Sequence, residues 1–510
     1  MEHELILILD FGSQYTQLIA RRFRELGVKT VIERGDLGAR EMRETAPIAV
    51  VLSGGPASVF EDGALQADPA VFDLGVPVLG ICYGHHLMAR DLGGEVRSSN
   101  RREYGLAELE VVGEGPVFEG TERRQPVWMS HGDLVAELPR GFEVLAKTPT
   151  TAVAAMFDAD RRFIGLQFHP EVRHTRHGTE ILEHFIELAG ARRDWNPAAI
   201  RHELVADLER SVPEGRVICG VSGGVDSSVT AILLREAVGE RLVPIFVDTG
   251  LLRKNEGDTV ARRFNEFGLD LDRIDASDRF FAALSGVEDP EEKRRIIGRE
   301  FVAVFEEEAA RFPDARYLAQ GTLYPDVIES SGVRGTAAVI KTHHNVGGLP
   351  ERLGLELVEP LRDLFKDEAR MVGEEVGLPH DFVWRHPFPG PGLAVRILGA
   401  VDPVRVRTLQ EADAILIEEI RADGLYDEIS QALCVLLPVK SVGVMGDSRT
   451  YENVLAVRAV TTTDFMTADW YRFPPETLDR IARRVVNEVA GINRVVYDVT
   501  SKPPGTIEWE

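Results

Sequence analysis

Cys82 occupies a position from which a thiol could act as a nucleophile. It follows the apolar run Val76–Leu79, and the segment after it, HHLMARDLGG, has the pattern of a helix. Gly80 and Gly84 flank the cysteine, so the chain can turn sharply between the predicted strand and the predicted helix. A thiol at this point lies at a helix N-terminus, where the helix dipole favours the thiolate form. The pattern therefore predicts a cysteine nucleophile on a strand–helix elbow.

A cysteine nucleophile needs a base and a group that orients the base. His169 and Glu171 are candidates for these roles, since they lie two positions apart at the end of the predicted strand RRFIGLQF. Glu171 is placed to hold the imidazole of His169, as the carboxylate does in a Ser-His-Asp triad. The loop Ser53–Pro56 (SGGP) follows another predicted strand and offers backbone N–H groups to an oxyanion. The alternative for Cys82 alone is a buried core thiol, and only the three segments together favour catalysis.

A second motif, SGGVDSS, lies between the predicted strand VICGV and the predicted helix VTAILLREAV. Its glycines, hydroxyls and helix N-terminus form a nest for phosphate oxygens. It is not a Walker A loop, because the chain contains no Gly-Lys dipeptide. The alternative is an ordinary Ser-Gly turn that caps a helix. The residues expected to contact phosphate are Ser222, Gly223, Gly224, Val225, Asp226, Ser227 and Ser228.

Three charged segments further along the chain are candidates for the acceptor side, or a lid, of this second site. Asp326 and Glu329 are three positions apart, which places them near one face of a helix. Lys341 is followed by a glycine-containing loop, and Lys366 lies in a segment rich in charged residues. Each segment taken alone is better explained as a solvated charged face than as a site.

The elements that must position these residues alternate between apolar strand-like runs and helical patterns. In residues 1–190 the runs LILILDFG, IAVVLSGGP and VPVLGICYG each end in glycine or a turn, and RVICGVSGG, LVPIFVDTG and RYLAQGT repeat this pattern in residues 191–385. Such runs are typical of parallel sheets whose functional loops lie at the carboxyl ends of the strands. We therefore expect an α/β protein with two doubly wound parallel-sheet domains, the first flavodoxin-like. A polar linker is expected around Arg192–Pro197, and mixed strands and helices over 386–510 predict a small α+β domain.

Composition excludes several classes of protein. The chain has 510 residues, of which 44% are hydrophobic and 28% charged, as in a soluble globular protein of about three domains. The formal net charge of −25 disfavours nucleic acid and anionic membranes as partners. The three cysteines form no CxxC pair, which excludes a disulfide scaffold and a zinc ribbon. We find no signal peptide and no apolar run long enough to span a membrane, so we expect a cytoplasmic protein.

The first constellation resembles the class I, or triad, glutamine amidotransferases, and the resemblance runs from Asp10 to about residue 190. It implies that Cys82, His169 and Glu171 are the glutaminase triad. It also implies that the amides of Gly55 and Tyr83 stabilise the oxyanion. One departure bears on glutamine binding, because the family usually has Gln, a residue that contacts the substrate glutamine, where this chain has His86.

The second constellation resembles the PP-loop of the ATP pyrophosphatases, which holds the β- and γ-phosphates of ATP while the α-phosphate is attacked. The resemblance implies that Asp226 holds Mg²⁺ against the phosphates and that adenine lies near the end of the strand ending in FVDTG. The further ATP-contacting residues implied here are Val247, Gly250 and Gly321.

Over the whole chain the sequence resembles the glutamine-hydrolysing GMP synthetase family. The resemblance implies three substrates, glutamine, ATP and XMP, and amination of XMP through an adenylyl-XMP intermediate with release of AMP, pyrophosphate and glutamate. It implies a homodimer formed through residues 386–510, and an XMP site made by Gln431, Arg494, Lys502, Ile507 and Glu508. The C-terminal segment SKPPGTIEWE carries two prolines, a glycine and a tryptophan, so we expect it to be docked.

Two alternatives remain at this point. The first is another amidotransferase-coupled ATP pyrophosphatase that uses a different acceptor. The second is a catalytically silent binding or regulatory protein on the same scaffold, against which the intact Cys82, His169, Glu171 and Asp226 argue.

Overall fold

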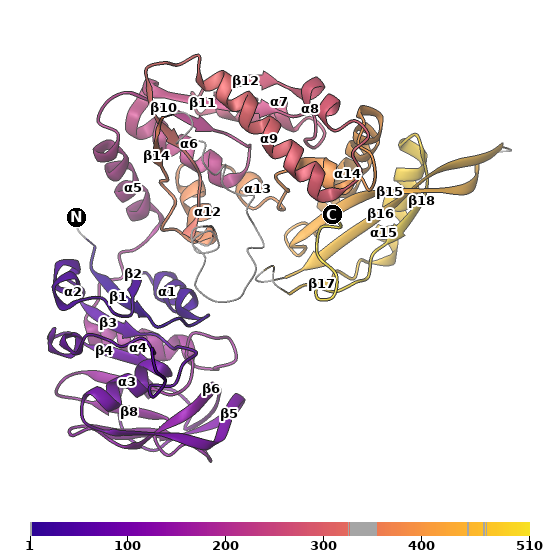
Figure 1. The fold of residues 1–510 in the computed structure, drawn as a ribbon. Coiled ribbons are helices and arrows are strands. Elements are labelled where there is room, and N and C mark those ends of the chain that lie inside the picture. The colour runs from indigo at the N-terminus through magenta and orange to yellow at the C-terminus, as the bar shows by residue number, and fades with distance from the viewer. Residues whose placement is uncertain (1–2, 325, 327–353, 446–447, 463–464, 466) are drawn as a thin grey trace. The chain divides into compact units, whose positions relative to one another are not determined.

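The computed structural model describes residues 3–324, 326, 354–445, 448–462, 465 and 467–510, with the backbone alone at residues 99–101 and 445. Contacts within the chain divide it into two compact units, residues 1–199 and 200–510 (Figure 1). The predicted site residues Glu329 and Lys341 lie outside the described residues.

The first unit is built on one sheet in the strand order β2-β1-β3-β4-β9-β8-β7-β5-β6. Its first five strands are parallel: β1 (Leu5–Asp10), β2 (Lys29–Arg34), β3 (Ala49–Leu52), β4 (Val78–Ile81) and β9 (Phe163–Leu166). The sequence predicted these strands because β1, β3, β4 and β9 are apolar runs buried between helices. The helices of this unit are α1 (Thr16–Glu25), α2 (Ala39–Thr45), α3 (Tyr83–Asp91) and α4 (Gly178–Ala189), with the 3-10 turns η1 (Pro69–Asp73) and η2 (Pro116–Phe118).

The remaining strands of this sheet are antiparallel, which differs from the predicted all-parallel arrangement. They are β5 (Glu95–Val111), β6 (Arg124–Glu137), β7 (Glu143–Lys147) and β8 (Ala155–Asp158). β7 and β8 are joined by residues 148–154, and β8 and β9 by residues 159–162. Both connections are shorter than the crossover of a dozen or more residues that parallel strands need. β5 and β6 are joined by the longer segment 112–123, which includes η2. The sheet is therefore a parallel core with an antiparallel extension.

The second unit begins with a fully parallel sheet in the order β12-β11-β10-β13-β14. Its strands are β10 (Arg216–Gly220), β11 (Leu242–Asp248), β12 (Asp272–Asp275), β13 (Ala315–Ala319) and β14 (Glu356–Val358). The helices around it are α5 (Pro197–Ser211), α6 (Val225–Val238), α7 (Glu256–Glu266), α8 (Ser277–Ala283), α9 (Pro290–Ala309), α12 (Lys366–Glu375) and α13 (His380–Val383), with the turn η3 (Gly239–Arg241). The predicted parallel sheet is confirmed here.

The chain ends in a mixed sheet packed against two helices, as predicted. A long antiparallel hairpin, β15 (Gln431–Met445) and β16 (Ser448–Thr461), is joined by β17 (Asp469–Trp470) and by β18 (Ile492–Tyr497), which runs parallel to β16. The helices are α14 (Pro403–Ala422), whose N-terminus is capped by the Asp402 carboxylate, and α15 (Pro475–Glu488). The turn η4 (Gly392–Arg396) precedes them. The hairpin and α14 are visible in orange and yellow in Figure 1.

Burial modifies two expectations about the domain boundaries. The polar segment predicted as a linker contains Trp195, which is buried and whose backbone N–H donates to the carbonyl of Gly27. In the second unit one hydrophobic cluster includes Ile218 and Ile245 of the parallel sheet together with Leu416 and Leu455 of the C-terminal part. The boundary at residue 385 stays a prediction, since side chains from both sides of it share this core. In the described part of the chain, no helix has the length and apolar character that crossing a membrane requires.

Candidate active sites

The elbow that presents Cys82 depends on its two glycines. Cys82 lies between β4 and α3 with a backbone φ of 52°, a conformation that a residue other than glycine adopts only under strain. A Cβ added to Gly80 would lie 2.5 Å from the carbonyl oxygen of Gly84, and one added to Gly84 would lie 2.3 Å from that of Leu52. Only glycine therefore permits the close approach of α3 to β3 and β4 that fixes the position of the thiol.

His169 and Glu171 are brought to this elbow, as predicted. His169 Nδ1 lies 2.7 Å from Glu171 Oε1, and both side chains are buried. Burial lowers the pKa of His169, but the Glu171 carboxylate and the neighbouring Cys82 thiol outweigh burial and raise this pKa well above its ordinary value. Glu171 and Cys82 thus favour the charged form of this imidazole, from which a proton can pass to a leaving group.

The loop Ser53–Pro56 lies against both the nucleophile and the base. A Cβ on Gly54 would come within 3.1 Å of His169 Cε1, and one on Gly55 within 3.2 Å of Tyr83 Cγ. The carbonyl of Ser53 also accepts the backbone N–H of Gly84, which ties the loop to the first turn of α3. Gly55 and Tyr83 are thus adjacent, the arrangement that a shared oxyanion site needs.

His86 lies one helical turn after Cys82, and its ring is buried. Its Nε2 donates to Gln167 Oε1 at 2.7 Å, because a carbonyl oxygen can only accept. Burial lowers the pKa of His86 to about 4, so the imidazole is neutral at physiological pH. A neutral hydrogen-bonding side chain thus occupies this position, as a Gln would, and the Nε2 of Gln167 is buried without a hydrogen-bond partner among the described residues.

A second buried cluster near His86 was not found by sequence reasoning. His131 lies with its ring 6.5 Å from that of His86, and its Nε2 donates to Glu103 at 3.2 Å. Burial raises the pKa of Glu103, but hydrogen bonds from His131, Thr150 and Thr151 outweigh it and bring the pKa down to about 2. The run Ser-His-Gly-Asp at residues 130–133 was the available signal, since it places four polar or turn residues inside an otherwise alternating strand.

The predicted phosphate loop connects β10 to α6. Gly223 has a φ of +74°, and Gly224 is the N-cap of α6. The hydroxyls of Ser222 and Ser227 lie 3.0 Å apart, and that of Ser228 donates to the carbonyl of Gly224 at 2.7 Å. The N–H groups of Ser222 and Gly224 are used within the loop, where they donate to the hydroxyls of Ser227 and Ser222. The loop is thus fixed at the N-terminus of α6, where the helix dipole favours an anion.

The other predicted nucleotide residues lie at the same carboxyl edge of the parallel sheet. Val247 is the last residue but one of β11, and Gly250, in the loop that follows, has a φ of +72°. Gly321, just after β13, is so close to the phosphate loop that an added Cβ would lie 2.9 Å from the carbonyl of Asp226. The close packing of Gly321 explains the requirement for glycine at that position.

Cations surround Asp226, and sequence reasoning found only one of them. Asp226 Oδ1 is buried without a hydrogen-bond partner among the described residues. Burial raises the pKa of Asp226, while Lys366, Arg370 and Arg385 act to lower it and Asp326 to raise it. The structure therefore brings the predicted Asp226, Asp326 and Lys366 together. Arg370 was missed because a single arginine on an amphipathic helix, here α12, usually marks a solvated face. Arg385 lies in the irregular segment after α13, where no periodic pattern marks it.

The C-terminal segment is docked, as predicted, and it brings Glu508 to Gln431. Gln431 Nε2 donates to Glu508 Oε1 at 2.8 Å, and Ile507 is buried in a small apolar cluster with Leu433 and Ala468. The buried Arg458 holds the segment by donating to the carbonyls of Thr506 and Ile507.

Two basic residues were predicted to bind XMP. Lys502 lies at the same end of the C-terminal sheet as Gln431, and Arg494 does not. Lys502 pairs with Ala468 and borders a cavity of about 670 Å³. Arg494 is opposite Val454 on β16, whereas Gln431 is opposite Val460, so about 20 Å of strand separates them along β16. Within one chain the structure therefore does not bring Arg494 to Gln431.

The three cysteines are expected to differ in reactivity. Iodoacetamide at pH 7 should modify Cys82 and leave the other two intact, because burial raises the pKa of Cys219 to about 12 and that of Cys434 well above its ordinary value. Mass spectrometry of the intact chain and of its peptides would check this. One adduct, lost in Cys82→Ala, is expected, and equal labelling of all three peptides would contradict it.

Comparison with known proteins agrees with this geometry. The family model described as glutamine amidotransferase class-I matches residues 7–188, and the one described as GMP synthase C terminal domain matches residues 418–509. Proteins named GMP synthase [glutamine-hydrolyzing] are similar over their full length. The one from Phenylobacterium zucineum (strain HLK1) is 57% identical over 515 residues, covering 100% of this chain and 99% of that protein. Those from Azoarcus sp. (strain BH72) and Aquifex aeolicus (strain VF5) are 55% and 52% identical, with 100% of both chains covered in each case. The chain therefore belongs to the family of glutamine-hydrolysing GMP synthases.

Proposed function

We propose that this protein catalyses the ATP-dependent amination of XMP to GMP with ammonia derived from glutamine. The observation that carries the proposal is the presence of two assembled sites on one chain. One is a cysteine–histidine–glutamate constellation at a strand–helix elbow, and the other is a phosphate nest beside a buried carboxylate. Amide hydrolysis and nucleotide activation are the two reactions that such an amination needs.

In the first reaction, the Cys82 thiolate attacks the amide carbon of glutamine. The amides of Gly55 and Tyr83 stabilise the oxyanion that forms. His169 transfers a proton to the departing ammonia, and Glu171 keeps the imidazole oriented at 2.7 Å during the transfer. Water then releases glutamate from the thioester. The neutral His86, held by Gln167, supports a role in binding the glutamine substrate.

In the second reaction, XMP O2 attacks the α-phosphorus of ATP, and pyrophosphate leaves. The Ser222–Ser228 loop and the cations Lys366, Arg370 and Arg385 receive the charge of the leaving pyrophosphate. The adenylyl group makes the base reactive at C2, and ammonia then displaces AMP to give GMP. Gln431, Ile507 and Glu508 form the wall proposed to read the xanthine base, and Lys502 is the cation proposed for the XMP phosphate.

Asp226 is the residue proposed to hold Mg²⁺. A carboxylate oxygen suits this hard cation, and the buried Oδ1 of Asp226 lacks a hydrogen-bond partner among the described residues, so the residue fits the group. When bound, Mg²⁺ would neutralise part of the negative charge of the phosphates.

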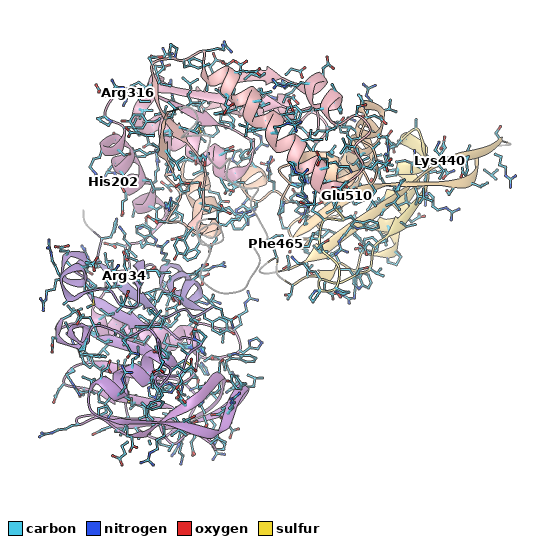
Figure 2. The ribbon with its side chains drawn as sticks, viewed as in Figure 1. Arg34, His202, Arg316, Lys440, Phe465 and Glu510 are labelled. Carbon is cyan, nitrogen blue, oxygen red and sulfur yellow. The ribbon has the colours of Figure 1, made fainter. Side chains whose placement is uncertain are left out.

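A homodimer is part of the proposal. The C-terminal sheet exposes the apolar side chains Val439, Val442, Val444, Tyr451 and Val496, in the hairpin that carries Lys440 in Figure 2 and on β18. An exposed apolar surface of this kind is typical of an interface. Because Arg494 is far from Gln431 along β16, a second copy is the way in which it would reach an XMP site.

The test is product analysis with ATP, Mg²⁺ and XMP, with either glutamine or ammonium chloride as the nitrogen source. GMP, AMP and pyrophosphate are expected from both. Absence of XMP-dependent AMP would overturn the proposed acceptor. GMP from ammonium alone would locate a defect at the glutamine pocket, and His86→Gln would then be expected to restore the use of glutamine.

A further inference from the structure

Both carboxylates near the end of the chain are held by fully buried cations. Arg396 donates to Glu508 through Nε at 3.1 Å and Nη2 at 2.8 Å, and its side chain has no exposed surface. Lys293, likewise without exposed surface, donates to the carboxylate of Glu510, which Figure 2 labels. Burying an arginine and a lysine costs free energy unless partners surround them, so these pairs fix the segment in one position.

Lys293 also determines where Arg396 lies. Its ammonium donates to the carbonyls of Ala394 at 3.2 Å and Ile397 at 2.7 Å, which flank Arg396 in and just after the turn η4. One ammonium thus joins α9, the turn that carries Arg396, and the C-terminal segment. The bidentate pair between Arg396 and Glu508 is set by this three-way connection.

The pair limits what the Glu508 carboxylate can do. A carboxylate paired with an arginine through two parallel bonds is ionised, and an ionised carboxylate accepts hydrogen bonds but donates none. Glu508 Oε1 already accepts from Arg396 and from Gln431, and Oε2 accepts from Arg396. Any further group that Glu508 contacts must therefore present a donor.

We propose that Arg396, positioned by Lys293, is a specificity-determining residue that makes Glu508 select a purine nucleotide with an N–H on its six-membered ring. A base whose ring nitrogen carries no hydrogen would place a hydrogen-bond acceptor against this carboxylate, which is also an acceptor. No hydrogen bond could then form. This inference rests on the proposed function, in which Glu508 contacts the base of the acceptor nucleotide.

The environment of Arg396 supports a role beyond bridging to Glu508. Burial lowers its pKa, but Glu508 and Asp413 outweigh burial and raise the pKa above its ordinary value. Its Nη1 is buried without a hydrogen-bond partner among the described residues, and Asp413 Oδ1 is 3.9 Å away. The ring of Phe388 lies 5.1 Å from the guanidinium carbon, which confines the side chain to the plane that faces Glu508.

Two quantities are measured in the full-length protein at saturating ATP. The first is the KM for XMP, and the second is the inhibition by purine riboside 5′-monophosphate in competition with XMP. This inhibitor has no N–H on its six-membered ring. In Glu508→Gln, whose amide can donate or accept, we expect the KM for XMP to rise roughly 10- to 100-fold, as for loss of a charge-assisted hydrogen bond. The inhibitor should bind as well as before or more tightly, so that discrimination between the two nucleotides falls.

Arg396→Met leaves the Glu508 carboxylate without its cation and destabilises the fold, whereas Asp413 keeps Arg253, whose Nε lies 3.4 Å from its Oδ2. The double variant Arg396→Met, Glu508→Gln removes both charges of the pair, and we expect it to fold and to show the same loss of discrimination as Glu508→Gln. Lys293→Met is expected to raise the KM for XMP and leave the KM for ATP unchanged, a split that general destabilisation does not produce. Arg407→Met, an exposed change on α14, is the matched control.

The outcomes separate this inference from the proposed function. If the unaltered protein forms no GMP from XMP, the proposed function fails. If it forms GMP, but Glu508→Gln and the double variant discriminate between the two nucleotides as the unaltered protein does, the role of Arg396 is refuted and the proposed function stands.

Discussion

Cys82→Ala is expected to abolish GMP formation from glutamine and to leave GMP formation from ammonium chloride within about two-fold of the unaltered rate. The thiolate is the group that attacks the amide, and loss of a catalytic nucleophile costs roughly 10³-fold or more. The second unit, which carries the phosphate loop, has its own fold and core, so its reaction should be unaffected when ammonia is supplied directly. Parallel assays of glutamate release and GMP formation measure the two effects separately.

Cys219→Ala is the matched control, because Cys219 is also buried and the chemical change is the same. Its thiol, with a pKa raised by burial to about 12, has no role in the proposed reaction. Normal glutamine-dependent GMP formation is expected from this variant. Glutamine-dependent activity in Cys82→Ala would show that the elbow is not the glutaminase site.

Asp226→Asn is expected to abolish GMP formation from both nitrogen sources. An amide oxygen is a much weaker ligand for Mg²⁺ than a carboxylate, and metal stabilisation of a phosphoryl transition state is worth several kcal/mol. We therefore expect the XMP-dependent release of AMP and pyrophosphate to fall about 100-fold or more. Asp278→Asn, an exposed change in the first turn of α8, is the control for a generic effect on a helix N-terminus.

The stability of Asp226→Asn distinguishes a lost function from a lost fold. Burial raises the pKa of Asp226 in the folded protein, so this carboxyl lowers the stability of the fold as the pH rises from its unfolded-state pKa through its folded-state pKa, and the loss remains at neutral pH. An asparagine does not ionise, and at neutral pH without nucleotide the variant should melt at the same temperature as the unaltered protein or higher. A large drop in melting temperature would mean that the cations around Asp226 depend on its charge, and the loss of activity would then have a structural cause.

The sequence by itself determined the features that depend on neighbouring residues. The elbow at Cys82 needs glycines at fixed positions because its backbone approaches β3 and α3 too closely for a Cβ, and this requirement is visible in the five residues from Gly80 to Gly84. The phosphate loop between β10 and α6 is equally local. The apolar runs of β1, β3, β4, β10 and β11 predicted parallel strands because both faces of such strands are buried.

The antiparallel extension of the first sheet could not be predicted in this way. β5 and β6 pair through a register with irregularities, and the side chains of β6 alternate between buried and more exposed positions. This pattern predicts a strand, but it does not indicate which neighbouring strand pairs with that strand or whether the pairing is parallel or antiparallel. The pairing depends on where each strand ends and on how the chain returns between them, which the sequence alone does not show.

Only the tertiary structure decided which polar and charged residues become partners in the interior. Arg396 and Glu508 are 112 residues apart, Lys293 and Glu510 are 217 apart, and His86 and Gln167 are 81 apart. On their own segments Lys293 and Arg396 look like residues of a solvated surface, because lysine and arginine are rarely buried without partners. Their partners come from distant segments that meet only when the cores assemble. The free energy of a buried ion pair depends on that meeting, and therefore no local pattern encodes it.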